Sequence, residues 1–104
     1  MDMKVTRNDD ATLVEFDHLR LDAAVAPQLK AALLKVVTDG AKKVVLDLHK
    51  VKMIDSSGLG ALVSVLKAMN GQGSITIRGA SSSVMGLFKL TRMDRVFTLE
   101  TVAA

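Results

Sequence analysis

The stretch "KKVVLDLHKVKMIDSSGLGALVSVLKAM", residues 42–69, predicts a buried strand followed by a helix. Between Val44 and Leu48 the apolar residues leave little alternation, which is typical of a strand covered on both faces of a parallel sheet. Beyond "MIDSSG" the apolar residues recur at helical spacing, so we expect a helix from about Ser57 to Met69 that ends at "NGQG". A strand that leads into a single helix is the repeating unit of α/β folds.

The segments on either side extend this pattern. "MKVTR" and "ATLVEF" flank "NDD" and predict a β-hairpin. Apolar residues between Leu29 and Val37 predict a helix that begins near Pro27 and ends before Gly40. "SITIR" predicts a further strand, the serines at 81–83 are suited to cap another helix, and "VFTLE" predicts the last strand.

The resulting order of elements is β-β-α-β-α-β-α-β. Strands separated by single helices imply right-handed crossovers and a largely parallel sheet. We therefore predict an α/β fold in which the helices pack mainly on one face of the sheet. A length of 104 residues suits one domain, which we place over residues 1–104.

The composition excludes several classes of protein. The chain is 49% hydrophobic, yet it has 3 aromatic residues, so the core must be aliphatic and stacking platforms for single-stranded nucleic acid are missing. The net charge of +3 comes from scattered Lys and Arg residues, which argues against nucleic acid as a partner. The absence of Cys excludes a disulfide framework and a Cys-based zinc site. No apolar run approaches the ~20 residues of a membrane span, so we expect a cytoplasmic protein without direct membrane insertion.

We find no set of residues that could carry out catalysis. His18 and His49 have no obvious companions for metal binding, so no metal ligand is predicted. "DSSG" is not the G-x-S-x-G elbow of serine hydrolases, because Ile54 stands two residues before Ser56. "GLG" at residues 58–60 is no dinucleotide fingerprint, because a valine occupies the place of the third glycine. We therefore predict a protein that is not an enzyme.

Two glycines near the start of the predicted helix require an explanation. Gly58 and Gly60 each cost up to about 1 kcal/mol relative to Ala inside a helix. Their missing side chains allow either a partner or another part of the chain to approach closely. The sequence leaves both explanations open.

The same helix is apolar on more than one side. Beside the stripe that faces the core, a second stripe contains Ala61, Val65 and Ala68, next to Ser57 and Ser64. A helix that is apolar all round is covered on more than one side, either by a neighbouring helix or by another protein. Of these we prefer another protein, which predicts a shallow docking surface.

The start of the helix is suited to a phosphate group. Asp55 or Ser56 can cap the helix, and the free N–H groups and the macrodipole of a helix N-terminus accommodate an anion. A phosphate on Ser56 adds about −1.5 to −2 charges beside Asp55. The fold should therefore tolerate the modification, whereas a partner docked over this end should be repelled.

The chain resembles a STAS domain of the anti-sigma-factor antagonist (anti-anti-sigma factor) type. The resemblance rests on "VVLDL", "HKVKMI" and "DSSGLG", on "RLDAA" around Asp22, and on "SSSVMGLFKLTRMDRVF". It implies a STAS-like single sheet of about five mixed, largely parallel strands. It also implies that Asp22 lies near Ser56.

The resemblance further implies a partner switch controlled by phosphorylation. An ATP-binding serine kinase, often itself the anti-sigma factor, would phosphorylate Ser56, and a metal-dependent serine phosphatase would reverse this; Ser57 is the alternative acceptor. The unmodified form would bind its target and the phosphorylated form would release it, with no cofactor on this chain, which we expect to be a monomer. We predict the partner-binding residues to be Asp22, Asp55, Ser57, Gly58, Leu59, Gly60, Ala61, Ser64, Val65 and Ala68. The alternative is an unphosphorylated STAS adaptor subunit of a membrane lipid or anion transport complex.

Overall fold

The computed structural model describes residues 3–100. All of the predicted strands and helices are present, and two strands of two residues and a 3-10 helix are added to them. The elements are β1 (Met3–Arg7), β2 (Thr12–Phe16), β3 (Arg20–Leu21), α1 (Ala26–Thr38), β4 (Lys43–Asp47), β5 (Met53–Ile54), α2 (Ser56–Ala68), β6 (Ser74–Arg78), α3 (Ser82–Leu90), η1 (Met93–Arg95) and β7 (Thr98–Glu100).

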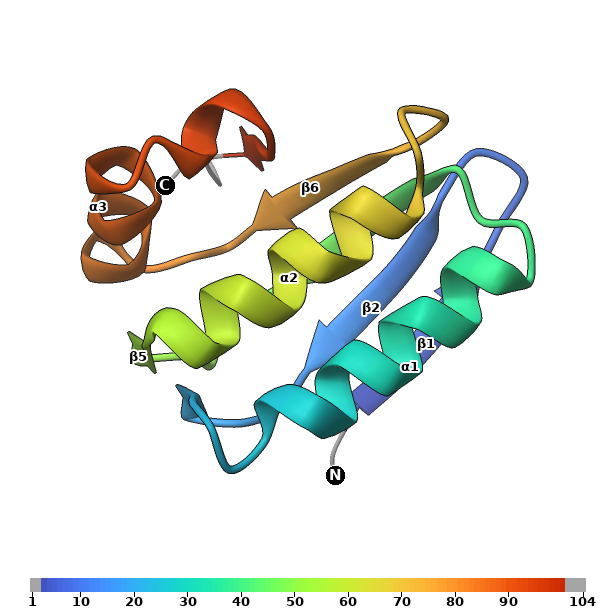
Figure 1. Ribbon diagram of the computed structural model, residues 1–104. Helices are drawn as coiled ribbons and strands as arrows, with labels where there is room; N and C mark the ends of the chain where they lie inside the picture. The colour runs from blue at the N-terminus through green and yellow to red at the C-terminus, as the bar shows by residue number, and fades with distance from the viewer. Residues whose placement is uncertain (1–2, 101–104) are drawn as a thin grey trace.

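Five strands form the main sheet in the order β1-β2-β4-β6-β7. β1 pairs antiparallel with β2, as the predicted hairpin requires, and the other neighbours are parallel. The predicted mixed, largely parallel sheet is therefore confirmed. β3 and β5 pair in parallel as a separate ladder near the carboxyl ends of the main strands (Figure 1).

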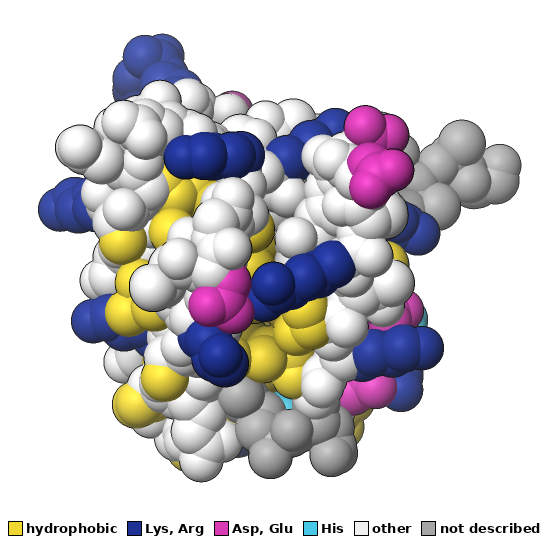
Figure 2. All heavy atoms as spheres, turned by 90° about the vertical axis from the view of Figure 1, so that its right-hand side faces the viewer, with side chains coloured by type: hydrophobic (Ala, Val, Ile, Leu, Met, Phe, Trp, Pro, Cys, Tyr) yellow, Lys and Arg dark blue, Asp and Glu magenta, His cyan; other side chains and the backbone are white. Residues whose placement is uncertain are grey.

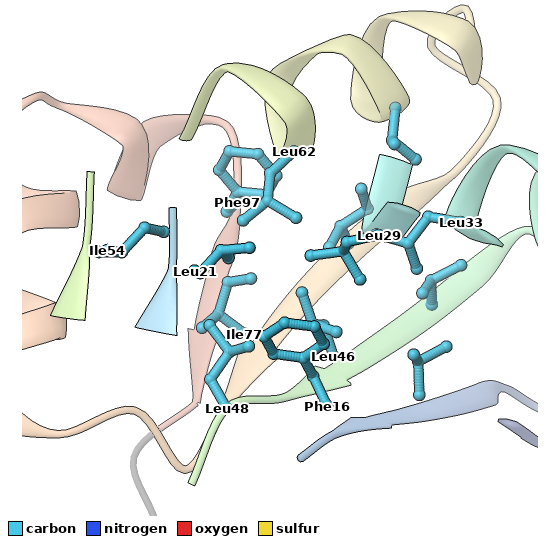
Figure 3. Packing of buried hydrophobic residues seen from close by; sticks show 14 of the residues in the cluster. Phe16, Leu21, Leu29, Leu33, Leu46, Leu48, Ile54, Leu62, Ile77 and Phe97 are labelled. Atoms are coloured by element: carbon cyan, nitrogen blue, oxygen red, sulfur yellow. The ribbon is translucent and has the colours of Figure 1, made fainter. Parts of the chain in front are cut away.

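α1 and α2 lie side by side on one face of the sheet, while α3 lies beyond the end of β6 (Figure 1). The core is mainly aliphatic, as predicted, although Phe16, Phe88 and Phe97 are also buried in it. Leu29 and Leu33 of α1 and Leu62 of α2 point toward Phe16 and Leu46 of the sheet, all of them at most 1% exposed (Figure 3). Burial of these side chains holds both helices on the same face.

The helix starts and stops follow the signals in the sequence. Pro27 lies in the first turn of α1, and Gly40, just past its end, has a φ of +104°, which favours glycine. Ser81 caps α3 by accepting a hydrogen bond at 3.2 Å from the N–H of Val84. The last strand begins at Thr98, later than predicted, because the N–H groups of Val96 and Phe97 donate to the carbonyl of Met93 at 3.1 and 2.9 Å and so belong to the preceding turn.

One prediction about α2 is wrong. At Ala61 and Val65 the second apolar stripe is covered by α1 and not by another protein, because the two helices pack side by side, whereas Ala68 is exposed. Val65 is 0% exposed and Ala61 is 7% exposed, so these side chains belong to the helix–helix contact. The neighbouring-helix explanation, which the sequence also allowed, is the correct one.

None of the helices within residues 3–100 combines the length and apolar composition that crossing a bilayer requires. On the face that Figure 2 shows, Lys and Arg side chains are spread over the whole view, with hydrophobic and acidic side chains between them. The described side chains of this face therefore make no single basic patch of the kind that nucleic-acid binding requires.

Candidate functional site

The short β3–β5 ladder brings two acidic residues to the start of α2. Leu21 of β3 pairs with Ile54 of β5, and the N–H of Asp55 donates to the carbonyl of Leu21 at 3.2 Å. Asp22 and Asp55 are the next residues of the two strands, so they follow neighbouring backbone positions. The expected proximity of Asp22 to the start of α2 is thus a consequence of two strands that sequence periodicity did not reveal.

Asp22 also shapes the entry to α1. Its carboxylate accepts a hydrogen bond from the N–H of Ala24 at 3.1 Å, and its carbonyl accepts from the N–H of Ala26 at 2.8 Å. This arrangement is an Asx turn, in which a short side chain accepts a hydrogen bond from the backbone two residues later and so fixes the local backbone. Asp22 therefore positions the first turn of α1 beside the first turn of α2.

The cap of α2 is Asp55, which decides between the two capping residues left open above. Its carboxylate accepts a hydrogen bond from the N–H of Gly58 at 3.0 Å, and its carbonyl accepts from the N–H of Leu59 at 3.0 Å. Ser56 is the first helical residue and is exposed. Within residues 3–100 its hydroxyl takes part in no hydrogen bond, so it is available for chemistry without loss of the cap.

The two glycines of this helix have different explanations. A Cβ on Gly58 would lie 2.4 Å from the carbonyl oxygen of Leu21 and 2.7 Å from its Cγ. Gly58 therefore lets α2 pack closely on the β3–β5 ladder. Of the two explanations given above, close approach by another part of the chain applies here, and close approach by a partner does not. A Cβ on Gly60 would meet nothing within 4 Å. Gly60 leaves open space at the surface.

That open space belongs to a groove between the first turns of α1 and α2. It has a volume of about 530 Å³ and is lined by Ala23, Ala26, Pro27, Lys30, Ser57, Gly60, Ala61 and Ser64. The hydroxyl of Ser64 donates to the carbonyl of Gly60 at 2.9 Å, so it closes one side of the groove. Lys30 is the one charged residue among the described residues that line it.

The predicted partner-binding residues fall into three groups. Ser57, Gly60 and half-buried Ser64 line the groove, whereas Asp22 and Asp55 do not line it and half-buried Leu59 packs against the core. Gly58 and Val65 are buried, and Ala61 contributes only the small exposed part of its side chain to the groove. Ala68 is exposed but lies at the far end of α2, where it lines a separate hollow with Asn70, Gln72 and Gly73. The structure therefore does not bring Val65 and Ala68 to the site.

Sequence reasoning missed the contribution of α1 to this groove. Ala23, Ala26, Pro27 and Lys30 form one wall of it, although Pro27 had been noted as a helix-start signal. The small residues at 23, 24 and 26 were a visible signal for a close helix contact. Which helix they contact depends on how α1 packs on α2, and no local sequence pattern indicates that packing.

The site has the character of a binding surface. Within the described residues, no group of three or more His, Cys, Asp and Glu side chains is arranged to hold a metal ion. An exposed hydroxyl, two acidic side chains and a shallow groove with a small-residue floor suit contact with another protein.

The chain matches the model of the family described as "STAS domain" over residues 2–104. It is 35% identical over 72 residues to the "Anti-sigma-B factor antagonist" of Staphylococcus aureus (strain NCTC 8325 / PS 47), a match that covers 68% of this chain and 67% of the relative. An anti-sigma-factor antagonist (STAS) domain protein from Planctomyces limnophilus has a TM-score of 0.84 at 24% identity, over 100% of this chain and 92% of that one. The Bacillus cell fate determinant SpoIIAA in its phosphorylated form has a TM-score of 0.74 at 13% identity, over 98% of this chain and 92% of that one. At these identities the two solved structures show that the fold is shared, and the three names are those of regulatory proteins and not of enzymes.

Proposed function

The chain belongs to the STAS domain family, and we propose that it is an anti-sigma factor antagonist whose partner binding is controlled by phosphorylation of Ser56. In this proposal the unmodified form binds a serine-kinase anti-sigma factor or an equivalent target, and the phosphorylated form releases it. A metal-dependent serine phosphatase restores the binding form. Because the kinase requires ATP, the switch operates in the cytoplasm.

The observation that carries the proposal is that Asp55, and not Ser56, caps α2. Asp55 caps α2, so the hydroxyl of Ser56 is exposed and has no structural hydrogen bond within the described residues. The N–H groups of Ser56 and Ser57 precede the first bond of the helix, which runs from the N–H of Leu59 to Asp55. A phosphate there gains about 0.3–1 kcal/mol from the helix terminus. Phosphorylation is therefore compatible with the folded chain.

The same phosphate stabilised by the helix terminus should weaken the binding of a partner. A phosphate on Ser56 concentrates negative charge beside Asp55 and close to Asp22, at the start of α2. One contact at ~4 Å with a like charge costs about 4 kcal/mol at an effective dielectric constant of about 20. Since about 1.4 kcal/mol is a tenfold change in affinity, one such contact weakens binding by roughly a thousandfold.

The test measures, by calorimetry, the affinity of variants at exposed serines for the candidate anti-sigma kinase. Ser56→Asp should abolish binding and Ser56→Ala should retain it, whereas Ser83→Asp, an exposed serine in the first turn of α3, should bind as the wild type does. Phosphopeptide mapping after incubation with the kinase and ATP should place one phosphate on Ser56. Equal binding by Ser56→Asp and the wild type would contradict the switch, and a phosphate on Ser57 would move the acceptor by one residue. Intact mass without any gain of phosphate would instead support the transport-adaptor alternative.

A further inference from the structure

A second hollow lies away from the switch, beyond the ends of β4 and β6 and against α3. It has a volume of about 590 Å³ and is lined by His49, Gly79, Ala80, Ser82, Met85, Gly86 and Lys89, none of which lines the α1–α2 groove. Small-molecule sites commonly have volumes of about 300–1,000 Å³. In parallel α/β sheets such sites also lie beyond the carboxyl ends of the strands.

Gly86 is an unexplained residue of α3 that this hollow accounts for. It lies inside a nine-residue helix, where glycine costs about 1 kcal/mol relative to alanine. A Cβ at this position would meet nothing within 4 Å, so no packing contact requires glycine here. The missing side chain deepens the hollow, which is the one structural effect of the residue that we find among the described residues.

His49 is held in the wall of the hollow by a buried carboxylate. Its Nδ1 lies 2.7 Å from Asp47 Oδ1, and its backbone N–H donates to the same oxygen at 2.9 Å. Asp47 is 8% exposed, and its other oxygen lies 3.9 Å from Arg78 Nε. The contact between Nδ1 and Asp47 therefore fixes the orientation of the ring, as supporting carboxylates do in binding sites. Nε2 is the ring nitrogen that remains for a ligand.

Gly79 permits this arrangement. It has a φ of +73°, and a Cβ there would lie 3.2 Å from the Cβ of His49 and 3.3 Å from Asp47 Oδ1. A side chain at this position would press on the His49–Asp47 pair from the end of β6. Two of the glycines of the chain thus keep the same hollow open.

The lining defines the chemistry of a ligand. Lys89 supplies a positive charge, and a protonated His49, whose Nδ1–H is held by Asp47, can donate from its Nε2–H to a carboxylate. The Ser82 hydroxyl adds a polar contact, while Ala80 and Met85 offer an apolar surface. The carboxylate of Asp47 is turned toward Nδ1 of His49 and toward the charge of Arg78, so it does not face the ligand. We propose that this hollow binds a small aliphatic carboxylate, with its carboxyl group between His49 and Lys89 and its carbon chain over Ala80 and Met85.

The test is titration of the full chain with butyrate, followed by amide and imidazole NMR signals. Butyrate should give saturable shifts at His49, Gly79 and Gly86 with a Kd in the millimolar range, which is usual for so small a ligand. His49→Gln and Lys89→Gln should each weaken binding by about tenfold, since each removes a charge-assisted contact. Lys67→Gln, an exposed lysine of α2, should bind butyrate as the wild type does.

Two further ligands test the chemical class. Butylammonium, with the same carbon chain and the opposite charge, should not shift these signals, and inorganic phosphate, which lacks the carbon chain, should bind more weakly than butyrate. Gly86→Ala fills part of the hollow with a better helix former, so it should weaken binding while the chain remains folded. Shifts that do not saturate, equal binding of butylammonium or phosphate, or unchanged binding by the His49 and Lys89 variants would overturn the proposal. None of these results depends on Ser56, so they leave the proposed switch untouched.

Discussion

Alanine substitution of Gly58 and Gly60 measures how closely α2 packs on the β3–β5 ladder. The two residues lie in the same part of one helix, so their helix propensities are similar. Their surroundings differ: a Cβ at 58 would lie 2.4 Å from the carbonyl oxygen of Leu21, while a Cβ at 60 would meet nothing within 4 Å. The pair therefore isolates the cost of displacing β3 from the benefit of replacing glycine in a helix.

The expected magnitudes follow from these contacts. Gly60→Ala should stabilise the protein by up to about 1 kcal/mol, the difference in helix propensity. Gly58→Ala gains the same amount but forces an overpacked contact that costs about 1–3 kcal/mol. It also displaces the carbonyl of Leu21 that accepts from the N–H of Asp55, a hydrogen bond with a net contribution of about 1 kcal/mol. The net result for Gly58→Ala is a loss of about 1–3 kcal/mol, or a fall in Tm of roughly 4–24 °C at about 4–8 °C for each kcal/mol.

Urea unfolding followed by far-UV circular dichroism measures both variants against the wild type. The midpoints should move in opposite directions while the slope stays constant, since neither change alters the surface exposed on unfolding. A Gly58→Ala variant as stable as Gly60→Ala would refute the reasoning. It would mean that the close approach of Leu21 does not constrain α2, and that the placement of Asp55 beside β3 has another cause.

Two more predictions concern the core and the surface. Val65→Arg should destabilise the protein by more than about 3 kcal/mol, because it places an unpaired charge at a fully buried position. The control Ala68→Arg, at an exposed position of the same helix, should change stability by no more than about 0.5 kcal/mol. Similar unfolding temperatures for the two variants would contradict the burial of Val65 in the helix–helix contact. The pKa of Asp39 is lowered from 3.8 by the hydrogen bond from Arg7 and the charge of Lys35. The contribution of Asp39 to stability is therefore complete above the unfolded value and is lost as the pH falls through the lower folded value. Arg7→Gln should accordingly lower stability at neutral pH and have a decreasing effect as the pH falls below 3.8, as urea unfolding at a series of pH values would show. A constant difference would contradict this prediction.

The sequence was informative wherever a local pattern has a local cause. The spacing of apolar residues located the helices and the main strands, since a strand or helix must present its apolar residues to one core. Cap residues such as Asp55 and Ser81 act within three residues of themselves, so they too can be recognised in sequence. The exposed start of α2 with its two serines was predictable for the same reason.

The remaining features depend on contacts between distant segments. β3 and β5 have two residues each, too few for any periodicity, and they exist because their backbones meet beside α2. The hydrophobicity of Val65 was evident from sequence, yet whether α1 or another protein covers it was not, because burial by a neighbour looks the same in one helix. The His49–Asp47 pair was overlooked because its importance lies in the hollow that α3 completes around it.

By itself the sequence determined the order of the main strands and helices, the mainly aliphatic core and the pair of serines near the start of α2, because each of these depends on interactions within one segment or on composition. Only the tertiary structure decided the separate reasons for Gly58 and Gly60, the α1 wall of the groove and the hollow beside His49. Those features arise from distances between segments far apart in the chain, and such distances are set by the packing of the whole core.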